Sequence, residues 1–269
     1  MPSILKREFA PISDQAWSQI DAEASAHLKN NLIARRVVDF SGPHGWQFAA
    51  VNLGTLKVSA KKGKEGVSWG TREVLPIIET RQPVTLKQME LDNFTRGSED
   101  VDLDPLQEAV VQAARFEDEA VFNGFAEGHI DGLVGSTEHK ALKLPKDPAG
   151  YPKVIAQAVQ AMRGVSVGGP YAVVLNSDLY YDLMGENKTG YPTHRLVSDI
   201  ATGGLHSSPA VKGGLVISLR GGDFELSVGK DFSIGYASHD RENVELFVTE
   251  SFTFRVIEGR AVVALNPAS

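Results

Sequence analysis

The feature that most constrains this fold is a long stretch of alternating side chains between Trp46 and Arg81. Apolar and polar residues alternate along two limbs, and a polar, glycine-containing segment at 61–66 separates them, which is typical of a β-hairpin. A limb of about a dozen residues is roughly 40 Å long at the rise of a strand, whereas a compact chain of this size has a radius of gyration of only about 18 Å. Pro76 indicates an edge strand, because proline cannot donate a ladder hydrogen bond. We therefore expect a hairpin that either wraps its own domain or projects from it.

The composition excludes several classes of protein. Cysteine is absent, which excludes disulfides, thiolate nucleophiles and cysteine-ligated metals, and favours a reducing, cytoplasmic location. The chain has no apolar run of the roughly 18 residues that a membrane span needs, and its N-terminus lacks the layout of a secretory signal. A net charge of −7 argues against a nucleic-acid partner, because neutralising phosphates needs a basic face. We expect a globular protein that binds neither membranes nor nucleic acid.

Helical periodicity flanks the hairpin. Residues 13–34 predict an amphipathic helix capped by Ser13. Residues 105–123 predict a second helix, with Asp104 as its N-cap and Pro105 at the first helical position. Further helices are expected at 151–163, from Asn176-Ser177 to Gly185, and around His194–Ile200.

The last third of the chain is rich in strand patterns. After a short buried strand at Tyr171–Leu175, we expect strands at Leu215–Leu219, Phe224–Val228, Phe232–Tyr236, Val244–Val248 and Phe252–Val256. Gly229-Lys230-Asp231 is predicted to be a hairpin turn. The whole pattern predicts an α+β fold with a helix-and-sheet body, an inserted middle region and one long arm.

No motif for catalysis stands in its required context. Gly164–Gly168 matches the nucleophile-elbow pattern of hydrolases, but a helix precedes Ser166 and a strand follows it, which reverses the necessary order. A serine hydrolase using Ser166 therefore stays only a distant alternative. The seven histidines show no metal-ligand spacing, so we expect no catalytic residue and no metal site. Glu117, near the apolar stripe of its helix, is expected to form an ion pair between domains or subunits.

A series of short segments points to a known family. They are Leu5–Ile12, Arg35–Asp39, Gly42–Trp46, Leu75–Glu79, Leu91–Asn93, Phe116–Glu119, Gly169–Tyr171, Arg220–Phe224, Asp231–Tyr236 and Thr249–Phe254. In this order they resemble the encapsulins (linocin-like proteins), the shell subunits of microbial nanocompartments. The resemblance runs from Leu5 to about Val256. It implies a non-enzymatic protein that self-assembles into an icosahedral shell around a cargo enzyme.

The resemblance divides the chain into three parts of an HK97 phage-capsid-like fold. Residues 46–82 correspond to the extended loop, which lies across a neighbouring subunit. Residues 130–220 correspond to the axial domain, which gathers around the five-fold axis. Residues 1–45, 83–129 and 221–269 correspond to the peripheral domain. Closed icosahedral symmetry implies a homo-oligomer of about 60 copies as the smallest shell.

The resemblance also implies two functional surfaces. The inner face of the family binds a short apolar peptide from the C-terminal tail of the cargo, which is a dye-decolourising peroxidase or a ferritin-like protein. The corresponding residues are Leu28, Leu32, Ile33, Asp39, Phe232 and Ile234. The family narrows its five-fold pore, which admits small substrates, at residues corresponding to Glu186, Asn187, Lys188, Thr189, Gly190 and Tyr191. The alternatives are that the first set is ordinary core and the second an ordinary exposed loop.

One position departs from the family, and one rival shares its fold. Met89 stands where some members carry an aromatic residue, so we assign no flavin or other cofactor. The rival is an HK97-type phage major capsid protein. We disfavour it because the chain is acidic and reaches its capped helix by Ser13, which leaves no room for a scaffolding segment.

Overall fold

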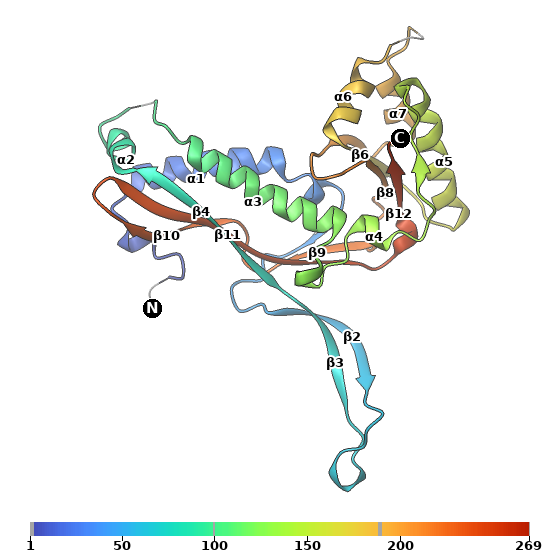
Figure 1. The fold of residues 1–269 in the computed structure, drawn as a ribbon, viewed down its shortest axis with the longest axis horizontal. Helices are drawn as coiled ribbons and strands as arrows, with labels where there is room; N and C mark the ends of the chain where they lie inside the picture. The colour runs from blue at the N-terminus through green and yellow to red at the C-terminus, as the bar shows by residue number, and fades with distance from the viewer. Residues whose placement is uncertain (1–2, 99, 188–189, 269) are drawn as a thin grey trace.

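The computed structural model describes residues 3–98, 100–187 and 190–268. They form a body of helices packed on a long sheet, a second body that contains the C-terminal strand, and an arm that projects from the first body (Figure 1). None of the described helices is long and apolar enough to cross a membrane. Within the described ranges, no group of three or more histidine or acidic residues could hold a metal ion.

Two long helices lie side by side on the main sheet: α1 (Asp14–Asn31) and α3 (Asp104–Asn123). The Ser13 hydroxyl accepts a hydrogen bond from the Ala16 backbone N–H at 3.3 Å, which confirms the predicted cap. The predicted Asp104 cap is wrong by one residue. Asp104 is already helical and Leu103 occupies the cap position without a side-chain bond, while Asp102 accepts from the Asp104 N–H. A shorter helix, α2 (Gln88–Thr95), follows the sheet.

The main sheet is built around one strand of 14 residues, β11 (Asn243–Val256). The sequence predicted two strands here, but the polar residues between them continue the ladder without a break. The other strands are β1 (Asp39–Ser41), β4 (Ile78–Lys87), β9 (Phe224–Val228) and β10 (Ser233–His239). One edge of β11 pairs with both β9 and β10, at different residues, and β1 pairs with β9. The other edge of β11 pairs with β4.

The predicted hairpin turn at Gly229-Lys230-Asp231 is wrong, because β9 and β10 do not pair with each other. β9 pairs with the end of β11 and β10 pairs with its beginning, so both lie on the same side of that strand. The intervening segment therefore steps along β11 instead of reversing the chain. This step places the half-buried Phe232 beside α1.

The second body is a five-stranded sheet covered by helices. Its strands, in spatial order, are β5 (Leu142–Lys143), β12 (Val262–Asn266), β8 (Gly214–Ser218), β6 (Tyr171–Leu175) and β7 (Gly204–Ser207). The helices are α4 (Leu133–Ser136), α5 (Tyr151–Gly164), α6 (Ser177–Gly185) and α7 (Thr193–Ile200). Every residue of β6 and β8 is buried. The C-terminal strand thus joins the region formed mainly by residues 130–220.

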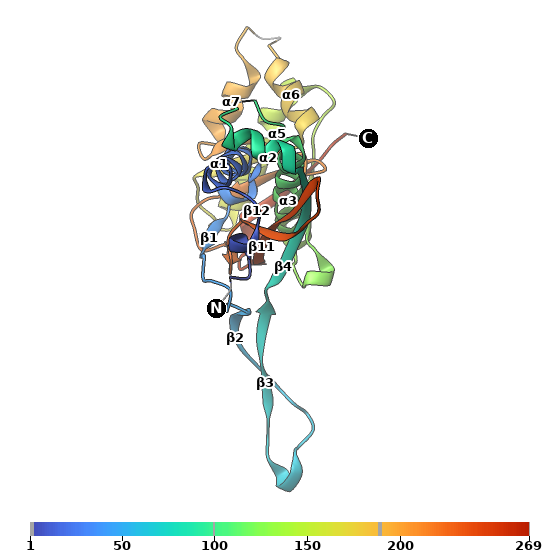
Figure 2. The same cartoon turned by 90° about the vertical axis from the view of Figure 1, so that its left-hand side faces the viewer.

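The arm is a two-stranded sheet, β2 (Ala50–Val58) and β3 (Gly70–Pro76), and it projects away from both bodies (Figures 1 and 2). Of the two expected arrangements, the structure shows projection. Beyond Pro76 the chain enters β4 and the main sheet. Short 3₁₀ turns complete the described elements: η1 (Arg7–Phe9), η2 (Ala34–Arg36), η3 (Lys64–Gly66), η4 (Ala126–Gly128), η5 (Pro148–Gly150) and η6 (Gly259–Ala261).

Candidate binding pocket on the first helix

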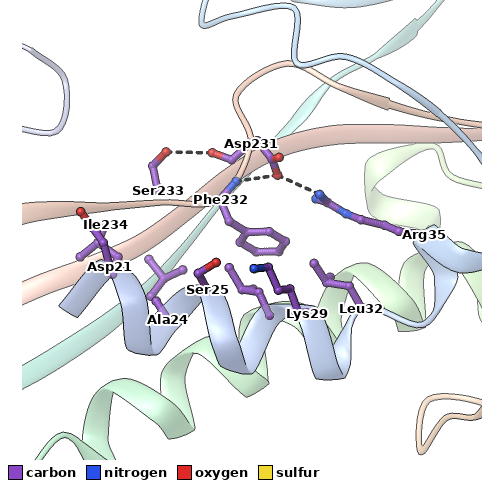
Figure 3. A pocket seen from close by; sticks show the side chains of 12 residues that line it. Asp21, Ala24, Ser25, Lys29, Leu32, Arg35, Asp231, Phe232, Ser233 and Ile234 are labelled. Atoms are coloured by element: carbon purple, nitrogen blue, oxygen red, sulfur yellow. Dashed lines mark hydrogen bonds and ion pairs between the residues drawn. The ribbon is translucent and has the colours of Figure 1, made fainter. Parts of the chain in front are cut away.

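A pocket of about 380 Å³ lies between α1 and the segment that leads into β10 (Figure 3). The helix supplies one wall and the segment around Phe232 supplies the other. The lining residues are Asp21, Ala24, Ser25, Leu28, Lys29, Leu32, Arg35, Asp231, Phe232, Ser233, Ile234 and Val248. Its size falls in the range of about 300–1,000 Å³ that is usual for ligand sites.

The structure brings four of the six predicted cargo residues together in this pocket: Leu28, Leu32, Phe232 and Ile234. Leu28 and Leu32 are four residues apart, so they lie on the same face at the end of α1. Phe232 and Ile234 are two residues apart, so they point to the same side of the extended segment. The pocket therefore has an apolar floor formed from both elements.

The other two predicted cargo residues lie elsewhere. Ile33 is 7% exposed and belongs to the core cluster that runs from α3 and the main sheet into the second body. It follows the end of α1 and lines another pocket, together with Asp118 and Ser208. Asp39 lies in β1, where one carboxylate oxygen accepts a hydrogen bond from the Gly222 N–H at 2.6 Å. It lines a separate pocket of about 160 Å³.

One end of the pocket is closed by Arg35, which lies at the centre of an ion-pair cluster. Its Nε and Nη2 donate to the Glu117 carboxylate at 2.7–3.0 Å, its Nη1 donates to Asp231 at 2.9 Å, and Nη2 also bonds to Glu250. Glu117 and Glu250 are buried, whereas the Asp231 side chain is 39% exposed. The expected ion pair of Glu117 is therefore present, with an arginine of the same chain.

The cluster holds more carboxyl groups than positive charge. Burial raises the pKa of Glu250 well above its ordinary value, and the nearby Glu117 raises it further. Burial acts to lower the pKa of Arg35, but its carboxylate partners outweigh burial and raise it. Arg35 therefore stays charged, and Glu250 retains its proton to a higher pH than an ordinary glutamate does.

Sequence reasoning did not identify Arg35 or Asp231 as parts of the pocket. The available signal was Glu117, an acid next to the apolar stripe of α3, which needs a buried partner. The sequence could not choose among the 27 lysines and arginines of the chain. The pairing depends on η2, α3 and β11 meeting in space.

The predicted pore residues that the structure describes lie between α6 and α7, at the tip of the second body (Figure 1). Glu186 and Asn187 follow α6, and the Glu186 carbonyl accepts a hydrogen bond from the Thr193 N–H at 3.3 Å. Gly190 has a φ of +75°, and Tyr191 is 44% exposed. Lys188 and Thr189 lie outside the described residues.

Ser166 lies in the turn between α5 and β6, so the reversed order expected from the sequence is confirmed. The Ser166 carbonyl accepts a hydrogen bond from Arg220 at 3.3 Å. Met89 is 61% exposed beside a shallow pocket of about 340 Å³.

Comparisons with known proteins agree over nearly the whole chain. The family model Linocin_M18, described as "Encapsulating protein for peroxidase", matches residues 2–253. A type 1 encapsulin shell protein of Rhodospirillum rubrum is 45% identical over 272 residues, which cover 98% of this chain and 97% of that protein.

Solved structures show the same fold at low identity. The virus-like particle of Pyrococcus furiosus is similar with a TM-score of 0.65 and 16% identity, over 93% of this chain and 99% of that chain. The capsid of cyanophage P-SCSP1u is similar with a TM-score of 0.53 and 10% identity, over 89% of each chain.

Proposed function

This chain belongs to the encapsulin family of shell proteins, and we propose that its copies close into an icosahedral compartment around a cargo enzyme. The family consists of structural shell proteins and not of enzymes. The expected α+β fold of the HK97 capsid type is confirmed by the structural neighbours. The proposed shell contains about 60 copies, the smallest closed icosahedral number, and lies in the cytoplasm.

The observation that carries the assembly proposal is the uncovered arm. Leu56 and Val58 on β2 are 59% and 66% exposed, and Trp69, directly before β3, is 50% exposed. The two strands project away from both bodies. A soluble protein seldom leaves a row of large apolar side chains in water, and such rows usually mark an interface. We assign residues 46–82 to the extended loop, with the Ala50–Pro76 ladder lying on a neighbouring copy.

The two bodies take the remaining roles in the shell. Residues 130–220 form the axial domain, to which we add β12 because it pairs with β8 and β5. The rest of the described chain forms the peripheral domain around α1, α3 and the main sheet. Small substrates cross the shell where the loops that carry Glu186 and Tyr191 meet around the five-fold axis.

We further propose that the pocket on α1 binds an apolar peptide from the cargo's C-terminal tail. Its support is the shared apolar floor of Leu28, Leu32, Phe232 and Ile234, which suits alternate side chains of an extended ligand. Ile33 and Asp39 lie outside this pocket and are not part of the proposed site. The description of the family as an encapsulating protein for peroxidase favours a peroxidase as cargo. We propose a dye-decolourising peroxidase, with a ferritin-like protein as the alternative.

The test of the cargo site is a matched pair of substitutions on α1. Leu28→Asp places a charge in the pocket, whereas Ala26→Asp places the same charge on an exposed residue of the same helix that does not line it. Shells are purified after co-expression with the peroxidase, and the enclosed protein is quantified by mass spectrometry. We expect Leu28→Asp to lose the cargo and Ala26→Asp to keep it. Equal loading of the two would refute the site.

The pore proposal has its own test. Tyr191→Ala removes an exposed ring from the loop between α6 and α7 and should change the rate at which an enclosed peroxidase oxidises a dye. The same enzyme outside the shell serves as the control, because its rate does not depend on the pore. An unchanged rate inside the variant shell would place the gate elsewhere.

The two alternative functions expected from the sequence, a phage major capsid protein and a serine hydrolase, are less well supported. The phage capsid shares only the fold at 10% identity, whereas the encapsulin relative shares 45% of residues over 98% of the chain. A fluorophosphonate probe tests the hydrolase directly, and labelling of Ser166 would support it.

A further inference from the structure

Arg35 differs from the other residues of the pocket because it touches both the pocket wall and the protein core. We propose that Arg35 is a positioning residue of the binding pocket: through Asp231 it holds Phe232 against the face of α1. This inference rests on the proposed cargo site, because it concerns how that site keeps its shape. It assigns Arg35 no direct contact with the peptide.

A single oxygen atom joins Arg35 to Phe232. Oδ1 of Asp231 accepts hydrogen bonds from Arg35 Nη1 and from the Phe232 backbone N–H, each at 2.9 Å (Figure 3). The guanidinium carbon also lies 5.2 Å from the centroid of the Phe232 ring, within the range of a cation–π contact. The position of Arg35 therefore restrains both the backbone and the ring of Phe232.

Arg35 is itself fixed by the core. Glu117 on α3 and Glu250 on β11 are 0% and 1% exposed, and both accept hydrogen bonds from the guanidinium. The Glu117 contact is bidentate, which fixes the plane of the guanidinium as well as its distance. Because both carboxylates are buried on packed elements, their positions do not depend on the segment around Phe232. The restraint thus runs from the core to the pocket wall.

The segment that carries Phe232 is attached to β11 on both sides, but not at Asp231 and Phe232 themselves. On the β9 side, Lys230 exchanges hydrogen bonds with Ser251 of β11, and on the β10 side the ladder begins at Ser233. Asp231 and Phe232 lie between these two attachments. Phe232 packs against the apolar cluster of α1 and β10. The side-chain hydrogen bonds of the segment are those of Asp231 Oδ1 with Arg35 and the Phe232 N–H, and the bond from the Ser233 hydroxyl to the Asp231 carbonyl at 2.9 Å. Loss of the Arg35–Asp231 contact would therefore loosen the backbone of the residue that carries the aromatic wall.

The experiment compares two substitutions of the same residue. Asp231→Ala removes the shared oxygen, whereas Asp231→Asn keeps an oxygen that can accept from both donors. Asp21→Ala is the matched control, because Asp21 is another partly exposed carboxylate at the pocket, and it pairs with Arg7 and not with the wall. The probe is a fluorescent protein fused to the C-terminal tail of a dye-decolourising peroxidase. It is co-expressed at a level that half-fills wild-type shells, and fluorescence per purified shell is measured.

We expect Asp231→Ala to bind the probe about tenfold more weakly, because binding would then have to order the wall, at a cost of about 1.4 kcal/mol. At the half-filling level of probe, this lowers the filled sites from about a half to about a tenth. Asp231→Asn should load within about twofold of wild type, and Asp21→Ala likewise, since a change of that size is less than about 0.5 kcal/mol. Rescue by asparagine separates a lost hydrogen bond from a general loss of charge. Arg35→Lys combined with Asp231→Ala should be no worse than the poorer single variant, because both break one connection.

The outcomes distinguish this inference from the cargo site itself. Phe232→Ala should abolish loading if the pocket is the site. Normal loading by Phe232→Ala would refute the cargo site and the inference together. Loss with Phe232→Ala but normal loading with Asp231→Ala would overturn the inference alone. Because the Asp231 side chain is 39% exposed, its substitutions leave the core in place even if Arg35→Lys fails to fold.

Discussion

The arm and the second sheet are both built from strands rich in valine and leucine, yet they differ in what covers these side chains. All five residues of β6 are buried, between β7 and β8 in the sheet and under helices on its face. Along β2, Val51 is the one buried residue of nine described, and Leu56 and Val58 are exposed. The apolar residues of such a strand predict that other residues will cover it. They do not predict whether those residues belong to the same chain or to another.

The different cover of the two sheets indicates where the free energy of assembly comes from. Full burial of a valine or leucine side chain contributes about 1.5–3 kcal/mol relative to exposure. β6 and β8 obtain this burial within one chain, so it stabilises the fold of the single subunit. In the proposed shell, the arm obtains it only against a neighbour, so its contribution would appear on assembly. Substitutions in the two regions should therefore fail in different ways.

The largest expected effect is on the arm. The double variant Leu56→Asp/Trp69→Asp places two charges on its exposed apolar side chains and should abolish assembly, because an interface cannot bury unpaired carboxylates cheaply. Lys61→Asp, in the polar turn at the tip, is the matched control and should still assemble. Size-exclusion chromatography with light scattering measures both. Shells formed by the double variant would show that the arm is not an essential contact.

The second effect is on the second sheet. Ile217→Ala in β8 deletes part of a side chain with 0% exposure and should lower the free energy of unfolding by about 2–5 kcal/mol. Its shells should still assemble at low temperature and unfold at a lower temperature by calorimetry. If this variant instead remained a stable, folded monomer, the distinction between the two regions would fail.

The third effect is a pH dependence confined to the buried region. Asp118 on α3 accepts hydrogen bonds from the Ile33 and Ala34 N–H groups and bonds to Ser208, so it joins the first body to the second. Burial raises its pKa from 3.8 to about 7. Between these values the folded chain keeps a proton that the unfolded chain has released, so this group's contribution to stability is lost as the pH rises.

The test is thermal unfolding of shells between pH 4 and pH 7, the window set by those two pKa values. Asp118→Asn carries no charge at any pH in this window, and its Oδ1 can still accept from Ala34. Its Nδ2 cannot accept from the Ile33 N–H as Oδ2 does, so the change of stability with pH is compared and not the absolute stability. The variant should lose less stability than wild type across this window. Parallel curves for the two proteins would assign the pH dependence to other groups.

The smallest effect is expected for a polar contact on the arm. Thr55 donates a hydrogen bond to Glu73 across the two strands at 2.8 Å, and both side chains are exposed. Thr55→Ala should change shell stability by less than about 0.5 kcal/mol. Leu56→Ala, its neighbour, should lower the denaturant concentration at which shells dissociate. A larger effect of Thr55→Ala would shift the contact to the polar face of the arm.

Local signals in the sequence predicted much of the fold. The Ser13 cap, the helix after Asn176 and the strands at Tyr171–Leu175 and Phe224–Val228 depend on neighbouring residues, and the structure confirms them. β11 shows where local signals fail. Thr249-Glu250-Ser251 interrupts its apolar pattern, but Thr80, Arg35 and Lys230 satisfy these polar groups, so the strand continues.

The pocket shows the same limit. Leu28 and Leu32 could be grouped from helical spacing, and Phe232 and Ile234 from strand spacing. Arg35 could not be added, because its partners lie 82, 196 and 215 residues away in the chain. Ile33 was expected from the family resemblance, but it follows the end of α1 at Asn31 and lines a different pocket from Leu32.

The central claim is that a chain with an uncovered arm completes its fold by closing into a shell with its own copies. Negative-stain electron microscopy of the purified protein, without any cargo, tests it most directly. The account predicts closed particles of uniform diameter in which each arm lies on a neighbouring subunit. Monomers, or open filaments in place of closed particles, would contradict it.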